Sequence, residues 1–175
     1  MAKVTVRKIR PGKLKINILG EEHLRDAEAE GLIRRAADAA FSAFDYPFRA
    51  YVDITLTDDE GIHVINREQR DVDRSTDVLS FPMNDFAEGV APDMVEYDLD
   101  PETGRLPLGD MVISVETARR QGEEYGHGFE RECAYLTVHS MLHLMGYDHL
   151  DEGEMKARMR EMEEKIMKVI GLERK

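Results

Sequence analysis

The sequence lacks the features that would place the chain in a membrane or outside the cell. No run of about 18 apolar residues occurs in its 175 residues, so we expect no membrane-spanning helix. The first residues, Met-Ala-Lys-Val-Thr-Val-Arg, contain no apolar signal core. The single cysteine, Cys133, excludes an internal disulfide and fits a reducing compartment. We therefore expect a cytoplasmic protein with one domain over residues 1–175.

An excess of basic residues is also missing. The formal net charge is −12, the wrong sign for a protein that coats nucleic acid non-specifically. The charge is unevenly spread, because residues 1–20 carry six basic and no acidic side chains, whereas residues 85–102 carry seven acidic and no basic ones. This polarity fits a basic groove that faces RNA, and equally a charge balance that only keeps the chain in solution.

Hydrophobic periodicity predicts an α/β fold, with about four strands in one mixed sheet surrounded by helices. Short alternating segments predict strands at residues 3–9, 13–19, 50–57, 78–81 and 110–115. Apolar residues at helical spacing predict helices at residues 24–44 and 129–145 and a last helix after Asp151. A capping pattern predicts a helix at residues 58–70, and residues 116–125 predict a polar helix that ends at Gly126. Residues 83–107, which are rich in proline and acidic residues, predict a surface loop.

Two helix starts carry capping patterns. Thr57 with Glu60 three residues later predicts an N-cap at Thr57, and Asp151 with Glu154 predicts one at Asp151. Methionines line one side of the last helix, from Met155 to Met162. Because methionine fills irregular interiors, we interpret this stripe as core.

The stretch from His139 to His149 reads H-x-x-x-H-x-x-G-x-x-H and holds three of the six histidines. Histidines four residues apart share one helix face, so His139 and His143 can reach one metal ion. Gly146 can end the helix in the left-handed conformation and return the chain to His149. Three imidazoles leave a fourth position open, which is the pattern of a catalytic zinc site. Nickel or another divalent metal would accept the same ligands.

One absence narrows the chemistry. Zinc proteases with this spacing place a glutamate, the general base, directly after the first histidine. Here that residue is Ser140, whose hydroxyl cannot accept a proton from water at neutral pH as a carboxylate does. The pattern therefore argues against ordinary peptide hydrolysis.

Arg70 is the other residue that suggests chemistry. It lies one helical turn after Asn66, at the end of the predicted helix. A guanidinium is a planar fork that matches phosphate oxygens and could stabilise charge there. The alternative is a solvated helix end, where arginine also favours the helix dipole.

The segment from His139 to His149 resembles the signature of the YbeY family, metal-dependent endoribonucleases of bacterial ribosomal RNA maturation. Two more stretches match, Asn66–Arg70 with Thr76–Pro82, and Leu108–Ser114. The resemblance covers about residues 50–170 and is weaker in the first 45. Gln69 stands where an aromatic residue is expected, and the acidic loop at residues 85–105 is longer than usual.

The resemblance implies a single-strand-specific endoribonuclease that acts in ribosomal RNA processing, including 16S 3′-end maturation, and in ribosome quality control. It implies zinc on His139, His143 and His149, catalytic roles for Arg70 and His139, and substrate binding by Asn66 and Arg70. The implied partners are single-stranded ribosomal RNA and the ribosome or its small subunit, without DNA or membrane. The nucleophile would be water activated by the metal or the 2′-OH of the RNA. Another metal hydrolase, such as a peptidase, and a non-enzymatic assembly factor remain alternatives.

Overall fold

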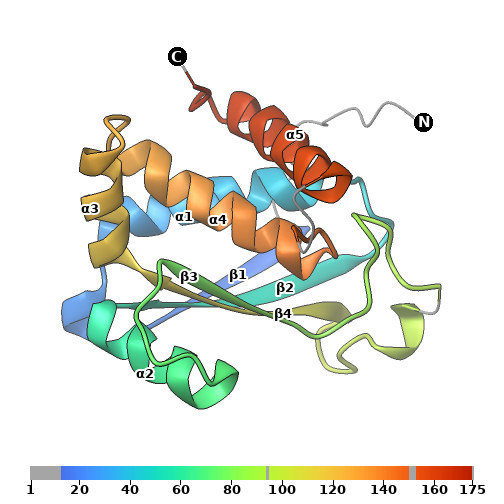
Figure 1. Cartoon of the computed structure of the whole chain (residues 1–175). Helices are drawn as coiled ribbons and strands as arrows, with labels where there is room; N and C mark the ends of the chain where they lie inside the picture. The colour runs from blue at the N-terminus through green and yellow to red at the C-terminus, as the bar shows by residue number, and fades with distance from the viewer. Residues whose placement is uncertain (1–12, 94, 150–152, 175) are drawn as a thin grey trace.

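The computed structural model describes residues 13–93, 95–149 and 153–174, and Figure 1 shows their arrangement. The predicted strand at residues 3–9 lies outside them. Within the described residues, the strands are β1 (Leu14–Leu19), β2 (Arg49–Thr57), β3 (Val78–Pro82) and β4 (Arg105–Ser114). The helices are α1 (Ala27–Ser42), α2 (Asp59–Arg70), α3 (Val115–Glu124), α4 (Phe129–Leu144) and α5 (Glu154–Val169). The predicted α/β class is confirmed.

The four strands form one mixed sheet in the order β1-β2-β4-β3. β1, β2 and β4 are parallel, and β3 pairs antiparallel with β4 at the edge. In β1 the predicted alternation is confirmed, since Leu14, Ile16 and Ile18 are buried on one face. β4 instead buries residues on both faces, as expected for a strand that helices cover from both sides.

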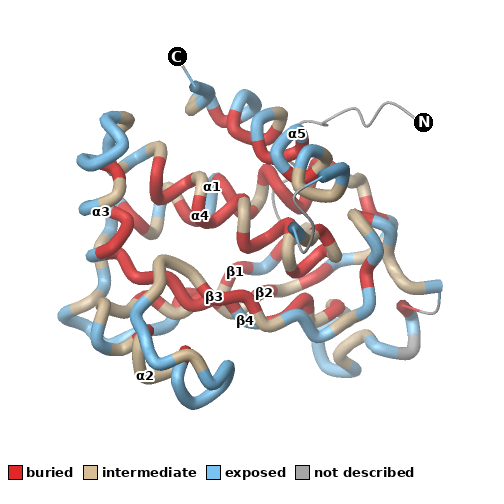
Figure 2. The backbone as a smooth tube through the Cα atoms, in the orientation of Figure 1, coloured by how far each residue is buried: buried red, intermediate tan, exposed pale blue. Residues whose placement is uncertain are grey.

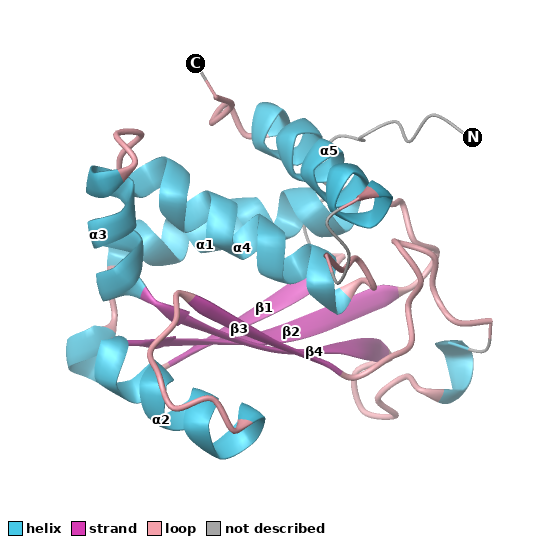
Figure 3. Cartoon of the chain, in the orientation of Figure 1, coloured by secondary structure: helices cyan, strands magenta, loops and turns pink. Residues whose placement is uncertain are grey.

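Helices cover the two faces of the sheet unequally, as Figures 1 and 3 show. α1, α4 and α5 lie on one side and bury the main hydrophobic core with the sheet. α2 lies on the other side over a smaller cluster, in which Ile62 packs with Leu79 and Val112. Figure 2 shows that α4 is largely buried between its neighbours. Within the part of the chain that is described, no helix has the length and apolarity to span a membrane.

Three predicted boundaries were wrong. The last strand begins at Arg105 rather than at residue 110, because Leu106 and Leu108 alternate inward and are fully buried. The surface loop is correspondingly shorter. Helix α2 is capped by Asp58, whose carboxylate accepts a hydrogen bond from the Gly61 N–H at 2.8 Å, whereas Thr57 belongs to β2. Helix α5 begins with Gly153 at its N-cap, and the predicted cap Asp151 lies outside the described residues.

Candidate metal centre and adjoining cavity

Helix α4 brings two of the predicted metal ligands together. His139 and His143 lie one turn apart on its half-buried edge, with their ring centroids 4.6 Å apart. Their Nε2 atoms are separated by 3.0 Å. The i, i+4 spacing therefore points both imidazoles at the same position.

Gly146 brings the third histidine back to this pair. It follows the helix end with a φ of 88°, a conformation that glycine adopts without steric cost. A β-carbon there would lie 2.3 Å from the carbonyl oxygen of Phe86, so the position also needs the absence of a side chain. The chain then places the ring of His149 at 5.1 Å from that of His143 and 5.6 Å from that of His139.

Each helical imidazole has a hydrogen-bond partner on its far nitrogen. Nδ1–H of His143 donates to the carbonyl oxygen of Tyr147 at 2.9 Å. Nδ1–H of His139 donates to Oε1 of Glu163 on α5 at 3.2 Å. These contacts fix the tautomer that leaves each Nε2 lone pair for a metal. Glu163 was missed by the sequence analysis, although an acid between Met162 and Ile166 on a buried stripe was a signal.

The three histidines could hold a metal ion, since one ligand nitrogen from each lies within 4.8 Å of the others. Tetrahedral ligands at about 2.1 Å from zinc lie roughly 3.4 Å apart, so the cluster fits with small adjustments. Burial, reinforced by the neighbouring His139, lowers the pKa of His143 to about 4. Its imidazole is therefore neutral at pH 7, which is the form that binds metals.

Arg70 reaches this site from the opposite side of the sheet. It is the last residue of α2, and its guanidinium donates a hydrogen bond to the carbonyl oxygen of Ser80 on β3. The guanidinium also lies over the ring of Phe81, 5.1 Å from its centroid. Arg70 thus wraps around the edge strand and lines the same cavity as the three histidines.

Asn66 is not brought to that cavity. It is only 4% exposed, and its amide donates to the carbonyl oxygen of Arg74 at 3.0 Å. Its own carbonyl accepts the backbone N–H of Val72 at 3.3 Å. These contacts hold the segment that leads from α2 to β3, at the turn where Asp71 adopts a φ of 56°.

Ser140 fills the place of the protease glutamate but faces the sheet. Its hydroxyl and that of Ser80 are 2.6 Å apart, and both are buried. A bulkier residue would meet β3 at this position. Ser140 therefore packs α4 against β3 and does not face the histidines' cavity.

The cavity beside the histidines has a volume of about 840 Å³. Its wall combines the edge strand β3, the segment after it and the turn that carries His149. Asp148 lines it too, and its carboxylate accepts the backbone N–H of His149 at 2.7 Å rather than an imidazole. The lining is mixed, with apolar Leu79, Met83 and Phe86, acidic Asp77, Asp85 and Asp148, and cationic Arg70.

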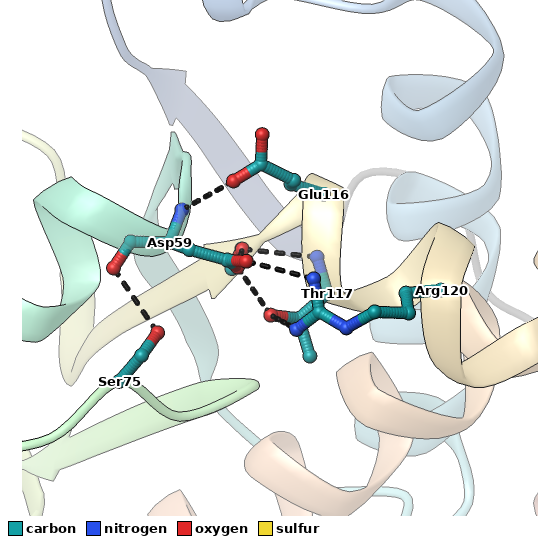
Figure 4. A network of polar contacts seen from close by, with 6 residues as sticks. Asp59, Ser75, Glu116, Thr117 and Arg120 are labelled. Carbon is teal, nitrogen blue, oxygen red and sulfur yellow. Dashed lines mark hydrogen bonds and ion pairs between the residues drawn. The ribbon is translucent and has the colours of Figure 1, made fainter.

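A polar network around Asp59 holds the first turn of α2, as Figure 4 shows. Its carboxylate accepts hydrogen bonds from Ser114 at 2.7 Å, from Thr117, and from Arg120 at 2.8 Å. Burial raises the pKa of Asp59, but these donors outweigh burial and lower the pKa to about 2. Backbone contacts to Glu116 and Ser75 join α2 to α3 and to the segment before β3. The sequence analysis missed this network, because Ser114, Thr117 and Arg120 lie far from Asp59 along the chain.

Comparison with known proteins gives the family. The sequence model described as Endoribonuclease YbeY matches residues 15–171. The chain belongs to the YbeY family. A YbeY relative named Endoribonuclease YbeY from Agathobacter rectalis is 47% identical over 150 residues, covering 80% of this chain and 89% of that protein. A second with the same name, from Caldanaerobacter subterraneus, is 45% identical and covers 91% of this chain and all of that protein.

The fold resembles that of a solved structure. The solution structure of TM1509 from Thermotoga maritima matches with a TM-score of 0.54 at 24% identity. The match covers 87% of this chain and 89% of that one. At this identity the likeness supports the fold alone.

Proposed function

We propose that this chain is a metal-dependent endoribonuclease that cuts single-stranded RNA. Its role would be ribosomal RNA processing in the cytoplasm, including 16S 3′-end maturation, and ribosome quality control, with the small ribosomal subunit as partner. The observation that carries the proposal is the meeting of three imidazoles and Arg70 at one cavity. The two relatives described above are named Endoribonuclease YbeY, which supports RNA as the substrate.

Arg70 would bind the phosphate that is cut. The Ser80 carbonyl and the Phe81 ring hold its guanidinium in one place, so little side-chain entropy is lost when a phosphate binds. Cleavage builds negative charge on the non-bridging oxygens, and a fixed cation stabilises that charge. Asn66 would act indirectly, by holding the segment that positions β3.

His139, His143 and His149 would hold the metal, with zinc as the expected ion and nickel or another divalent ion as substitutes. A bound divalent ion would supply Lewis-acid chemistry at the phosphate and activate a nucleophile at neutral pH. Glu163 and the Tyr147 carbonyl would keep the imidazoles oriented for it. The nucleophile would be water or the 2′-OH of the RNA, which leave a 5′-phosphate or a 2′,3′-cyclic phosphate respectively.

The test compares RNA cleavage by ribonuclease-free wild type, Arg70→Ala and His143→Ala, each with its metal content measured. We expect wild type to cut single-stranded but not duplex RNA, and analysis of the product ends identifies the nucleophile. Arg70→Ala should keep its metal and lose about two orders of magnitude in rate, whereas His143→Ala should lose both. Arg67→Ala, an exposed arginine on the same helix, is the matched control and should cut normally. Equal cutting by all four proteins would mean that a contaminating ribonuclease causes the cleavage. The chain would then be better described as a non-enzymatic assembly factor.

A further inference from the structure

A row of half-buried side chains leads away from the metal centre along α4. Arg131, Tyr135, His139 and His143 follow one another at four-residue spacing and are all of intermediate exposure. The ring of Tyr135 lies 5.9 Å from that of His139. Arg131 is eight residues from His139, or roughly 12 Å along the helix axis. The row therefore extends along α4 from the metal centre to the surface around Arg131.

A small cavity lies at the Arg131 end of this row. Its volume is about 120 Å³, several times the share of one water molecule in the liquid. Arg131 and Tyr135 of α4 line it, together with Arg160 and Glu163 of α5 and with Arg174. Three guanidinium groups thus surround one cavity in a chain whose net charge is −12.

These arginines have no anionic partner among the residues that the structure describes. None of Arg131, Arg160 and Arg174 forms a salt bridge or hydrogen bond there, and Nε of Arg131 is buried without any partner. A buried donor that lacks a partner is costly, so it indicates a ligand or another missing partner.

The nearest buried carboxylate is already engaged. Glu163 accepts a hydrogen bond from His139 at 3.2 Å and another from Tyr135. Burial, with this bond to Glu163, raises the pKa of Tyr135, so its hydroxyl stays protonated and donates. The other acid on the wall, Glu164, is exposed. The guanidinium groups therefore remain available for an anion from outside.

We infer that Arg131, Arg160 and Arg174 form a second phosphate-binding subsite, which holds the RNA backbone a few nucleotides from the phosphate that is cut. The inference rests on the proposed function, because that function supplies the RNA. An arginine fork matches the oxygens of a phosphate or a carboxylate, and the proposed function supplies the phosphates of RNA. The row on α4 gives the strand a path between the two subsites.

The test measures binding separately from cleavage. Fluorescently labelled single-stranded RNA of 12 and of 3 nucleotides is titrated against the full chain, with Arg70→Ala as background to suppress cutting. Changing Arg131 and Arg160 together to glutamine should weaken binding of the longer RNA about tenfold and lower its salt slope by about 1 or more. The loss for the 3-nucleotide RNA should be much smaller, because it cannot contact the metal centre and the arginine cluster at once.

Controls separate charge from folding. Arg49→Gln, an exposed arginine that lines neither cavity, should leave both measurements unchanged. Changing Arg131 and Arg160 together to lysine should retain most of the affinity. If the double glutamine variant fails to fold, Arg160→Gln alone, at an exposed position, replaces it and should still weaken binding of the 12-nucleotide RNA. An unchanged affinity and salt slope for the 12-nucleotide RNA would overturn the subsite, even if wild type cuts RNA. The subsite would also be overturned if inorganic phosphate stabilised the protein against unfolding but the glutamine changes left RNA binding unaffected. If the glutamine changes weaken RNA binding but wild type never cuts RNA, the subsite stands and only the proposed nuclease function is refuted.

Discussion

The hydroxyl groups of Ser80 and Ser140 meet at 2.6 Å and tie the edge strand β3 to the helix that carries the metal ligands. Ser80 also offers its carbonyl oxygen to Arg70. One residue of β3 therefore touches both parts of the proposed machinery. The distance between Arg70 and the imidazoles depends on how closely β3 packs against α4.

Ser140→Ala should cost about 1–2 kcal/mol in the free energy of unfolding, because it leaves the buried Ser80 hydroxyl without its partner. Adding Ser80→Ala removes the unpaired group, so the double variant should be less unstable than the sum of the single changes. Urea denaturation of all four proteins measures this coupling. Strict additivity would show that the two hydroxyl groups do not interact.

Ser140→Glu places the protease base in the sequence but should not produce a peptidase. The position is fully buried against β3, so the carboxylate would be desolvated without a cation. We expect a loss of more than about 3 kcal/mol in unfolding free energy and no cleavage of a casein substrate. Casein cleavage that a chelator blocks would contradict this expectation.

Glu163→Gln should weaken zinc binding by about 10- to 100-fold, because the amide loses the charge that supports the His139 imidazole. Competition with a fluorescent chelator measures the affinity, and the absorption spectrum of the cobalt-substituted protein reports the ligand geometry. Glu164→Gln, one residue away and exposed, is the matched control. Equal zinc affinities in the two variants would show that Glu163 does not support metal binding.

Gly146→Ala should damage both stability and metal binding. The residue has a φ of 88°, and an added β-carbon would meet the Phe86 carbonyl at 2.3 Å. We expect a loss of at least about 1–2 kcal/mol in unfolding free energy and a displaced His149. Gly126 has a φ of 75°, but a β-carbon added there would meet open space. Gly126→Ala therefore introduces backbone strain without a steric clash and is the control. Metal affinity should fall in the first variant and not in the second.

Asp59→Asn should destabilise the protein in a pH-dependent way. The folded pKa of about 2 is below the ordinary 3.8, so the ionised carboxylate adds stability above pH 4 and loses it as the pH falls toward 2. After allowance for the partial exposure of the side chain, the contribution is about 1–2 kcal/mol at pH 7. Urea unfolding at pH 7 and pH 3 should show a smaller difference at the lower pH.

Asp58→Asn is the control for that experiment, because it removes a neighbouring charge while asparagine still caps the helix. Its effect on the unfolding free energy should be within a few tenths of a kcal/mol. A similar loss in both variants would assign the effect to general charge rather than to the network.

Local patterns predicted much of this molecule. The alternation of β1 and β2, the extent of α4 and the turn at Gly146 depend on residues close in sequence, and each was predicted. The start of β4 was not, because Pro107 suggests a loop, whereas pairing with β2 places it in the sheet. The partners of Glu163 and Ser80 lie 24 and 60 residues away along the chain, so periodicity could mark Glu163 as buried but could not identify either partner.

The two groups proposed to act on one phosphate belong to different hydrophobic units. The helix that carries His139 and His143 packs in the main core. Arg70 is the last residue of α2, which packs on the small cluster of Ile62, Leu79 and Val112. The edge strand β3 lies between Arg70 and the imidazoles. Affinity for the metal and binding of the substrate can therefore change through separate sets of interior substitutions, whereas a displacement of β3, which carries Leu79, would alter both at once.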